Sequence, residues 1–129
     1  MATVRRFEEF EAWQKAHELT REVYGFSKAG PFARDFGLRD QMRRAAVSVM
    51  SNIAEGFERG GTAEFLQFLA VSKASAGEVE SQLYVALDQK YISEEQFRAV
   101  RQTAASTKRL IAGLMNYLRR SGIRGTKYR

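Results

Sequence analysis

Apolar residues recur every three or four positions over most of the chain, which is the spacing of one face of an α-helix. The sequence contains four such stripes. They consist of Phe10, Trp13, Ala16, Leu19, Val23 and Phe26; of Met42, Ala46, Val49 and Ile53; of Phe65, Leu69, Ser72, Ala76, Val79, Leu83 and Ala86; and of Phe97, Val100, Ala104, Thr107, Ile111, Leu114 and Leu118. The pattern predicts four amphipathic helices and no strand.

Residues that favour helix ends place these helices at about residues 8–29, 37–59, 63–90 and 94–121. Gly30 and Pro31 are expected to stop the first helix, because glycine adopts the left-handed conformation and proline cannot continue a helix. Gly60 and Gly61 separate the second helix from the third, for which Thr62 is the expected N-cap. The fourth begins at a capping box, Ser93-Glu94-Glu95-Gln96, in which Ser93 and Gln96 exchange hydrogen bonds.

The predicted connections are short, so neighbouring helices should run antiparallel. A length of 129 residues fits a single domain, here residues 1–129. We therefore expect an all-α fold, an antiparallel up-down-up-down four-helix bundle, followed by a basic tail over residues 122–129.

The residues available for chemistry are few. The chain has no cysteine, which excludes disulfides, thiol catalysis and cysteine-bound zinc, and it has one histidine, His17. A di-iron bundle requires Glu three residues before His, where this chain has Gln14. The sequence has neither a Ser-His-Asp set nor a strand-to-helix phosphate loop. We expect no enzyme activity, no catalytic residue, no metal and no cofactor.

No apolar leader opens the chain, and no stretch reaches the roughly 18 apolar residues of a membrane span. We therefore expect a soluble, cytoplasmic protein that contacts no membrane, and no small-molecule substrate is evident.

The net charge of +6 is unevenly distributed. Residues 1–60 carry a net +1, residues 61–96 a net −4 and residues 97–129 a net +9. A purely cationic last quarter suggests nucleic acid, an anionic surface or an acidic partner. The alternative is a solvated helix face that neighbouring acidic segments balance. The candidate nucleic-acid-binding residues are Arg98, Arg101, Lys108, Arg109, Arg119, Arg120, Arg124 and Lys127.

A further set of residues carries a resemblance to a known family. These residues are Gly37-Leu38, Gln41, Arg43-Arg44-Ala45, Ser48, Asn52-Ile53-Ala54-Glu55-Gly56, Arg59, Glu64-Phe65, Ser75, Glu78 and Gln82-Leu83. From about Phe7 to Leu118 the chain resembles the bacterial four-helix-bundle proteins known as 23S ribosomal RNA intervening-sequence, or S23, proteins. It departs from them at Met50, where many members have proline, and at Ala74, where glycine usually precedes the serine.

The resemblance implies a four-helix bundle that assembles into a ring-shaped homopentamer. It also implies a relationship to the accessory variability proteins of diversity-generating retroelements, which bind nucleic acid and work beside a reverse transcriptase. The implied partners are therefore other copies of this chain, RNA or DNA, and a protein such as a reverse transcriptase.

Two polar rows flank the apolar stripes of the second and third helices. Ser48, Asn52, Glu55 and Arg59 are spaced by four, three and four residues, and Ser75, Glu78 and Gln82 by three and four. If these helices are antiparallel neighbours, the rows can meet in one polar seam. Gly56 falls on the apolar stripe, where the missing side chain lets another helix come close.

The polar seam has two interpretations. Glu55 and Glu78 could form a carboxylate pair for acid–base or metal chemistry. Alternatively, the seam consists of hydrogen-bonded and charge-paired groups that hold helix register or a subunit contact, with Arg43 or Arg44 as the counter-charge. We favour the second interpretation.

Two functions remain open. The first is a nucleic-acid-binding accessory protein without catalysis. The second is a structural or adaptor ring that recruits a protein partner and whose positive charge is incidental. They differ in whether Arg98, Arg101 and Lys108 form a continuous positive patch on the assembled ring, or are neutralised by Glu78, Glu80 or Glu94 of a neighbour.

Overall fold

The computed structural model describes residues 3–120 of the chain. Its elements are a short 3-10 helix, η1 (Phe7–Glu9), and five α-helices: α1 (Glu11–Phe26), α2 (Gly30–Arg34), α3 (Phe36–Arg59), α4 (Thr62–Asp88) and α5 (Glu94–Arg120). Over these described residues there is no strand, so the predicted all-α class is confirmed.

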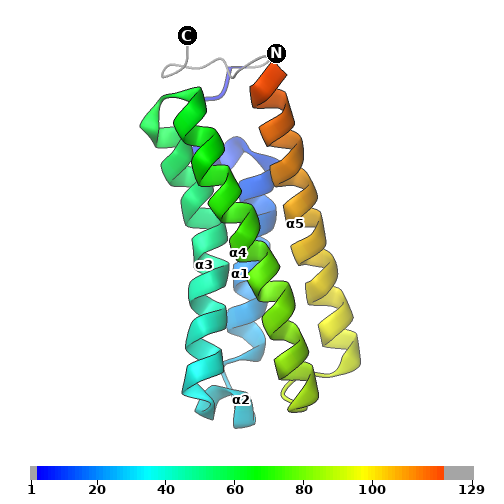
Figure 1. Cartoon of the computed structure of the whole chain (residues 1–129). Coiled ribbons are helices and arrows are strands. Elements are labelled where there is room, and N and C mark those ends of the chain that lie inside the picture. Colours follow the sequence, from blue (N-terminus) through cyan, green and yellow to red (C-terminus); the bar gives the residue numbers. More distant parts are fainter. Residues whose placement is uncertain (1–2, 121–129) are drawn as a thin grey trace.

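The four long helices lie side by side (Figure 1). Helix α3 packs on α1 and α4, while α5 packs on the same two helices from the other side. Short turns connect successive long helices, which consequently run in alternating directions (Figure 1). Helix α2 lies at the end of the molecule opposite to the C-terminus of α5 (Figure 1).

The first helix ends earlier than predicted. Helix α1 stops at Phe26 rather than at residue 29. The Ser27 hydroxyl donates to the Val23 carbonyl at 2.7 Å, and Arg43 Nη2 donates to the Ser27 carbonyl at 3.2 Å, which satisfies carbonyl groups at the helix end. Gly30, with φ +70°, and the residue after it therefore begin the unpredicted α2 instead of terminating α1.

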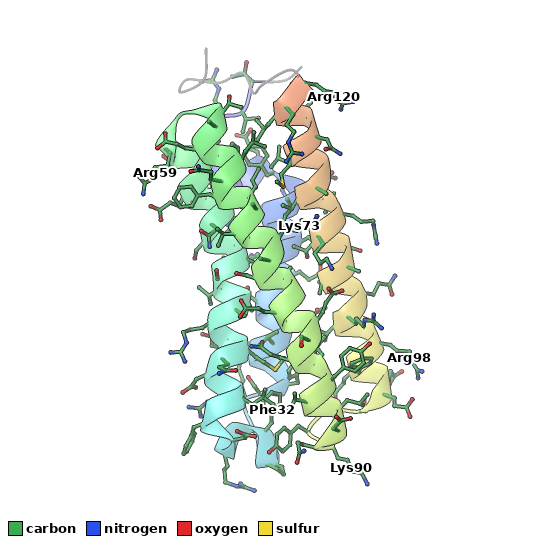
Figure 2. The ribbon with its side chains drawn as sticks, viewed as in Figure 1. Phe32, Arg59, Lys73, Lys90, Arg98 and Arg120 are labelled. Carbon is green, nitrogen blue, oxygen red and sulfur yellow. The ribbon has the colours of Figure 1, made fainter. Side chains whose placement is uncertain are left out.

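Helix α2 covers one end of the core. Its Phe32 is only 1% exposed and stacks between Phe26 and Tyr91, with ring centroids 5.6 and 5.1 Å away. The Tyr91 hydroxyl donates to Asp35 Oδ2 at 2.8 Å, and Asp35 Oδ1 accepts from the Leu38 amide at the start of α3. The long helices are thus tied together at this end, which Phe32 marks in Figure 2.

The two predicted caps have different outcomes. The Ser93 capping box is confirmed: the Gln96 amide donates to Ser93 Oγ at 3.0 Å, and the Ser93 amide donates to Gln96 Oε1 at 2.9 Å. The prediction that Thr62 is an N-cap is wrong, because α4 already includes Thr62 and its N-cap is Gly61. Gly60 adopts the left-handed conformation, with φ +89°, and is the C-cap of α3. Gly60 and Gly61 together complete the turn, and α4 begins directly at Thr62.

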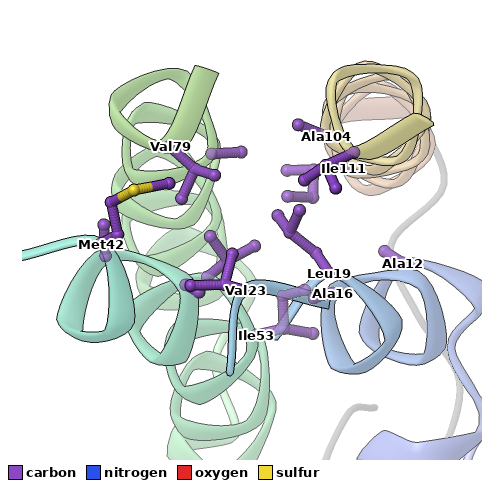
Figure 3. Close-up of a cluster of buried hydrophobic side chains, with 14 of the residues drawn as sticks. Ala12, Ala16, Leu19, Val23, Met42, Ile53, Val79, Ala104 and Ile111 are labelled. Carbon is purple, nitrogen blue, oxygen red and sulfur yellow. The ribbon is translucent and has the colours of Figure 1, made fainter. Parts of the chain in front are cut away.

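The core lies between the four long helices, and each contributes fully buried side chains such as Leu19, Met42, Val79 and Ile111 (Figure 3). Buried apolar surface is the main source of stability for such a fold. Two hydroxyl groups in the core bond across helices to carbonyls of α3. Thr20 donates to the Ala46 carbonyl at 3.1 Å. Ser72 donates to the Val49 carbonyl at 2.6 Å, so these bonds help to hold the register of α3 against α1 and α4.

Candidate functional site

Two of the predicted nucleic-acid-binding cations are paired with carboxylates of their own chain. Lys108 Nζ lies 2.7 Å from Glu80 Oε1 on α4, and the Glu80 side chain is 18% exposed. Arg98 Nη1 lies 3.7 Å from Glu94 Oε1, one turn earlier on α5, and both side chains are more than two-thirds exposed. The Lys108 pair therefore cancels a charge at the α4–α5 boundary, whereas the Arg98 pair is solvated and weak.

The other arginines of α5 have no ion-pair partner among residues 3–120. Arg101 holds its guanidinium 5.5 Å from the centre of the Tyr84 ring on α4, a cation–π contact. Arg109 donates to Ser106 Oγ at 2.9 Å and Arg119 to Asn116 Oδ1 at 3.3 Å. These three side chains and Arg120 are exposed, so their charges face solvent.

The unpaired arginines are widely spaced along the helix. Arg101 and Arg120 are separated by about 28 Å at 1.5 Å per residue. Of Arg98, Arg101 and Lys108, two lie beside carboxylates of the same chain, which lowers the net positive charge of this set. Two more predicted cations, Arg124 and Lys127, lie outside the described residues.

The predicted polar seam lies between α3 and α4. The hydroxyl groups of Ser48 and Ser75 are 2.8 Å apart across the two helices. Asn52 donates from Nδ2 to the carbonyl and the hydroxyl of Ser48, at 2.8 and 2.9 Å. The structure therefore brings these three residues together as a hydrogen-bonded contact between the helices.

Glu55 and Glu78 do not form a pair. Glu55 binds Arg59 on its own helix at 3.2 Å, and both are at least half exposed. Since Ser48 lies opposite Ser75 on an antiparallel neighbour, Glu55 and Glu78 are offset by ten residues along the axis, or about 15 Å. The hypothesis of a carboxylate pair is thus wrong. Within residues 3–120, no group of three or more His, Cys, Asp or Glu side chains could hold a metal ion.

The two arginines proposed as counter-charges of the seam have different surroundings, although both border one hollow beside Tyr24. Arg43 faces α1, where Nε donates to Ser27 Oγ at 2.9 Å and the guanidinium lies 4.5 Å from the Tyr24 ring centre. Arg43 therefore binds Ser27 at the end of α1 and is not part of the seam. Arg44 instead lines a surface groove between α3 and α4.

This α3–α4 groove has a polar lining, and most of its polar side chains are bonded to no other described residue. Its lining residues are Gln41, Arg44, Ala45, Ser48, Glu78 and Gln82. The side chains of Gln41, Arg44, Glu78 and Gln82 make no hydrogen bond or ion pair to any residue in the described range. Gln82 Oε1 is buried and has no partner there. The groove thus leaves the exposed cation of Arg44, the exposed carboxylate of Glu78 and the exposed amide of Gln41 available to another molecule.

At Gly56, α3 and α4 are in close contact. A Cβ atom at this position would lie 2.7 Å from Phe68 Cβ and 2.9 Å from Phe65 Cδ1. The predicted close approach therefore occurs, and it sets the spacing of the helices that form the groove.

One carboxyl between α1 and α5 was not singled out by the sequence. Burial raises the pKa of Glu22 above its ordinary value of 4.5, and Glu18 raises it further. Thr103 Oγ1 donates to Glu22 Oε2 at 3.2 Å, which partly opposes the increase in pKa. Glu22 Oε1 is buried without a partner in the described range. The sequence could not single out Glu22, because its burial and its contact with Thr103 depend on how α1 and α5 pack against each other.

The apolar outer surface of α4 was also missed. Val71, Tyr84 and Val85 are 51%, 46% and 45% exposed. The two valines carry a signal in the sequence, because they belong to a stripe of positions that alternate by four and three residues: Gln67, Val71, Ala74, Glu78, Ser81 and Val85.

In the part of the chain that the structure describes, no helix is long and apolar enough to cross a lipid bilayer.

Comparisons with known proteins agree with the arrangement of helices. A crystal structure of a protein of unknown function from the S23 ribosomal protein family of Bacteroides thetaiotaomicron VPI-5482 matches with a TM-score of 0.74 and 22% sequence identity, over 81% of this chain and 95% of that chain. At this identity the likeness shows the shared fold. A search among curated proteins returned no match. The family of 23S rRNA-intervening sequence proteins matches residues 8–113, which include the whole α3–α4 groove. The chain therefore belongs to the 23S rRNA-intervening sequence protein family.

Proposed function

We propose that this protein is a non-catalytic, antiparallel four-helix-bundle protein that binds RNA or DNA without sequence preference, through the exposed arginines of α5. The observation that carries the proposal is the set of exposed arginines without a carboxylate partner within residues 3–120: Arg101, Arg109, Arg119 and Arg120. Residues 97–120 of α5 contain no Asp or Glu that could repel a phosphate. A planar guanidinium can donate two parallel hydrogen bonds to one phosphate, which favours arginine over lysine for this contact.

Self-association is part of the proposal. A single chain offers few phosphate contacts, spread over about 28 Å between Arg101 and Arg120. In a homopentamer the net charge of +6 per chain would add up to about +30, and each weak contact would be repeated. Binding by such an assembly is expected to exceed that of one chain by multivalency and to depend strongly on salt.

Fluorescence polarisation with labelled single-stranded RNA and DNA tests this function. Four phosphate contacts per site predict an affinity that falls about 50-fold between 50 and 200 mM salt. Replacing three of the arginines together (Arg109→Gln, Arg119→Gln and Arg120→Gln) should weaken binding and reduce that salt effect to about threefold. The matched control replaces both members of the ion pair together, Lys108→Gln with Glu80→Gln, which leaves the net charge unchanged and should bind almost as the wild type does. Absence of binding at about 50 mM salt would refute the proposal.

A second candidate function is a structural or adaptor ring that recruits a protein. It is supported by the pairing of Arg98 with Glu94 and of Lys108 with Glu80, which lowers the charge available to nucleic acid. Under this alternative, the triple arginine variant still assembles and binds its protein partner as the wild type does.

A further inference from the structure

Several arginines of this chain lie over aromatic rings. Each guanidinium is at most 5.5 Å from the centre of its ring, which is a cation–π contact. The pairs are Arg39 with Phe36, Arg43 with Tyr24, Arg59 with Phe68, and Arg101 with Tyr84. Such a pair places a flat π-surface beside a cation, and these are the two groups that bind the bases and phosphates of single-stranded nucleic acid.

The pairs differ in whether the guanidinium is free. Three of the arginines are bonded to other groups of the chain: Arg39 to Asp40 and the Ala33 carbonyl, Arg43 to Ser27, and Arg59 to Glu55. Arg101 instead makes no hydrogen bond or ion pair within residues 3–120. All of its N–H donors are therefore free for a phosphate, which a guanidinium can bind through two parallel hydrogen bonds.

The Tyr84 ring is held in place and yet remains accessible. It meets the ring of the buried Phe97 at a centroid distance of 5.0 Å and an angle of 69°. Phe97 and Arg101 are one turn apart on α5, so both approach Tyr84 from the helix that lies beside α4 (Figure 1). Tyr84 is nevertheless 46% exposed. Because its position is already fixed by these contacts, a base that stacks on its exposed side immobilises little additional side-chain freedom.

The charges around Tyr84 favour a strand that leaves the ring along α5. Glu80, one turn before Tyr84 on α4, is paired with Lys108 at 2.7 Å. Asp88, one turn after Tyr84, is exposed and has no ion-pair partner among the described residues. Residues 97–120 of α5 contain neither Asp nor Glu. A phosphate next to Tyr84 is therefore repelled from the end of α4 and attracted towards α5.

We propose that Tyr84 and Arg101 bind one nucleotide of single-stranded RNA or DNA, whose base stacks on the Tyr84 ring while its phosphate binds the Arg101 guanidinium. The proposal rests on the nucleic-acid binding proposed above and adds the form that is bound, a single strand rather than a duplex. Every base has a π-face, so the site has no sequence preference. The bases of a duplex are stacked on one another and reach an aromatic side chain only if they are flipped out, which costs free energy.

Fluorescence polarisation with three labelled probes of about 12 nucleotides tests the site: a single strand, the duplex of the same sequence, and an abasic strand with the same number of phosphates. The wild type should bind the abasic strand at least about fivefold more weakly than the complete single strand. Tyr84→Ala should weaken binding of the complete single strand at least about fivefold, but binding of the duplex and the abasic strand less than about twofold, because neither offers an unpaired base. Tyr84→Phe keeps the ring and should bind as the wild type does. RNA and DNA strands should respond alike, since stacking does not involve the 2′-hydroxyl.

The salt dependence separates stacking from charge. Tyr84→Ala removes no phosphate contact, so its single-strand affinity should still fall about 50-fold between 50 and 200 mM salt. Arg101→Gln removes one contact and should reduce that fall to about 20-fold. The matched control is Phe36→Ala, which removes a ring that is 62% exposed and lies beside Arg39, a cation already paired with Asp40. This control should bind every probe as the wild type does.

The possible outcomes distinguish the site from the general binding function. Circular dichroism should show that each variant remains helical, so a loss of affinity reports a lost contact and not unfolding. A Tyr84→Ala variant that binds the single strand as the wild type does, or that loses affinity equally for all three probes, would overturn the nucleotide site while leaving charge-driven binding by α5 standing. A wild-type chain that binds the abasic strand as well as the complete strand would do the same. A wild-type chain that binds no probe at about 50 mM salt would overturn both proposals.

Discussion

At Gly56, α3 and α4 lie so close together that the replacement of one hydrogen by a methyl group should measurably destabilise the fold. In Gly56→Ala the new Cβ would meet Phe68 Cβ at 2.7 Å and Phe65 Cδ1 at 2.9 Å. Both distances are shorter than the roughly 3.5–4.0 Å at which carbon atoms attract each other. Phe68 Cβ is bonded to the backbone, so a rotamer change cannot move it away, and the helices must shift apart by several tenths of an ångström.

The expected magnitude is the balance of two opposing effects. Alanine in a helix interior is favoured over glycine by about 1 kcal/mol. Overpacking of a well-filled contact costs about 1–3 kcal/mol, and a collision with a backbone-bound atom belongs at the upper end of that range. The net loss in the free energy of unfolding should therefore be about 2 kcal/mol, or about 5–8 °C in melting temperature for a domain of this size.

Urea unfolding monitored by circular dichroism measures this loss, and Gly113→Ala is the matched control. Gly113 lies inside α5, is exposed and has no atom within 4 Å of the position its Cβ would take. Gly113→Ala should therefore stabilise the protein by about 0.5–1 kcal/mol, the helix-propensity term alone. If Gly56→Ala proved as stable as the wild type, the steric argument would fail, and with it the role assigned to Gly56 in setting the spacing of α3 and α4.

Two further predictions concern the charge at Glu22 and the cap at Ser93. The folded-state pKa of Glu22 is raised above 4.5, so the folded protein holds this proton more tightly than the unfolded chain does. The associated stabilisation is present below pH 4.5 and is lost as the pH rises through the folded-state pKa. Glu22→Gln should consequently be more stable than the wild type at pH 7, with a difference that shrinks towards pH 4.5 in thermal melts; a difference that is constant with pH would contradict the assignment. Ser93→Ala removes the oxygen that accepts from the Gln96 amide and should cost about 1 kcal/mol in urea unfolding, whereas Ser93→Asp should retain most of the stability. Equal losses in both variants would show that the cap is not the cause.

The local features of the chain were predictable because they depend on residues within one or two turns of each other. The period of the apolar positions predicted the long helices, and the capping box at Ser93 appears with both expected hydrogen bonds. The close approach at Gly56 followed from its place on an apolar stripe. The early end of the first helix was missed because a distant residue intervenes: Arg43 of α3 satisfies the end of α1, and the chain begins α2 at Gly30. The misplaced N-cap at Thr62 was a local error of one residue.

The sequence by itself determined the all-helical class, the family and the surplus of cations in the last quarter, since each of these depends on composition, periodicity or motif. Only the tertiary structure decided which charges remain available, because ion pairing depends on the register between helices. That register places Glu80 against Lys108 and separates Glu55 from Glu78 by about 15 Å along the antiparallel helices. Among residues 3–120 it also leaves Arg44 and Glu78, which line one groove, without an ion pair. A shift of one residue turns a helical side chain by about 100°, so the same sequence in another register would present different charges to its partners.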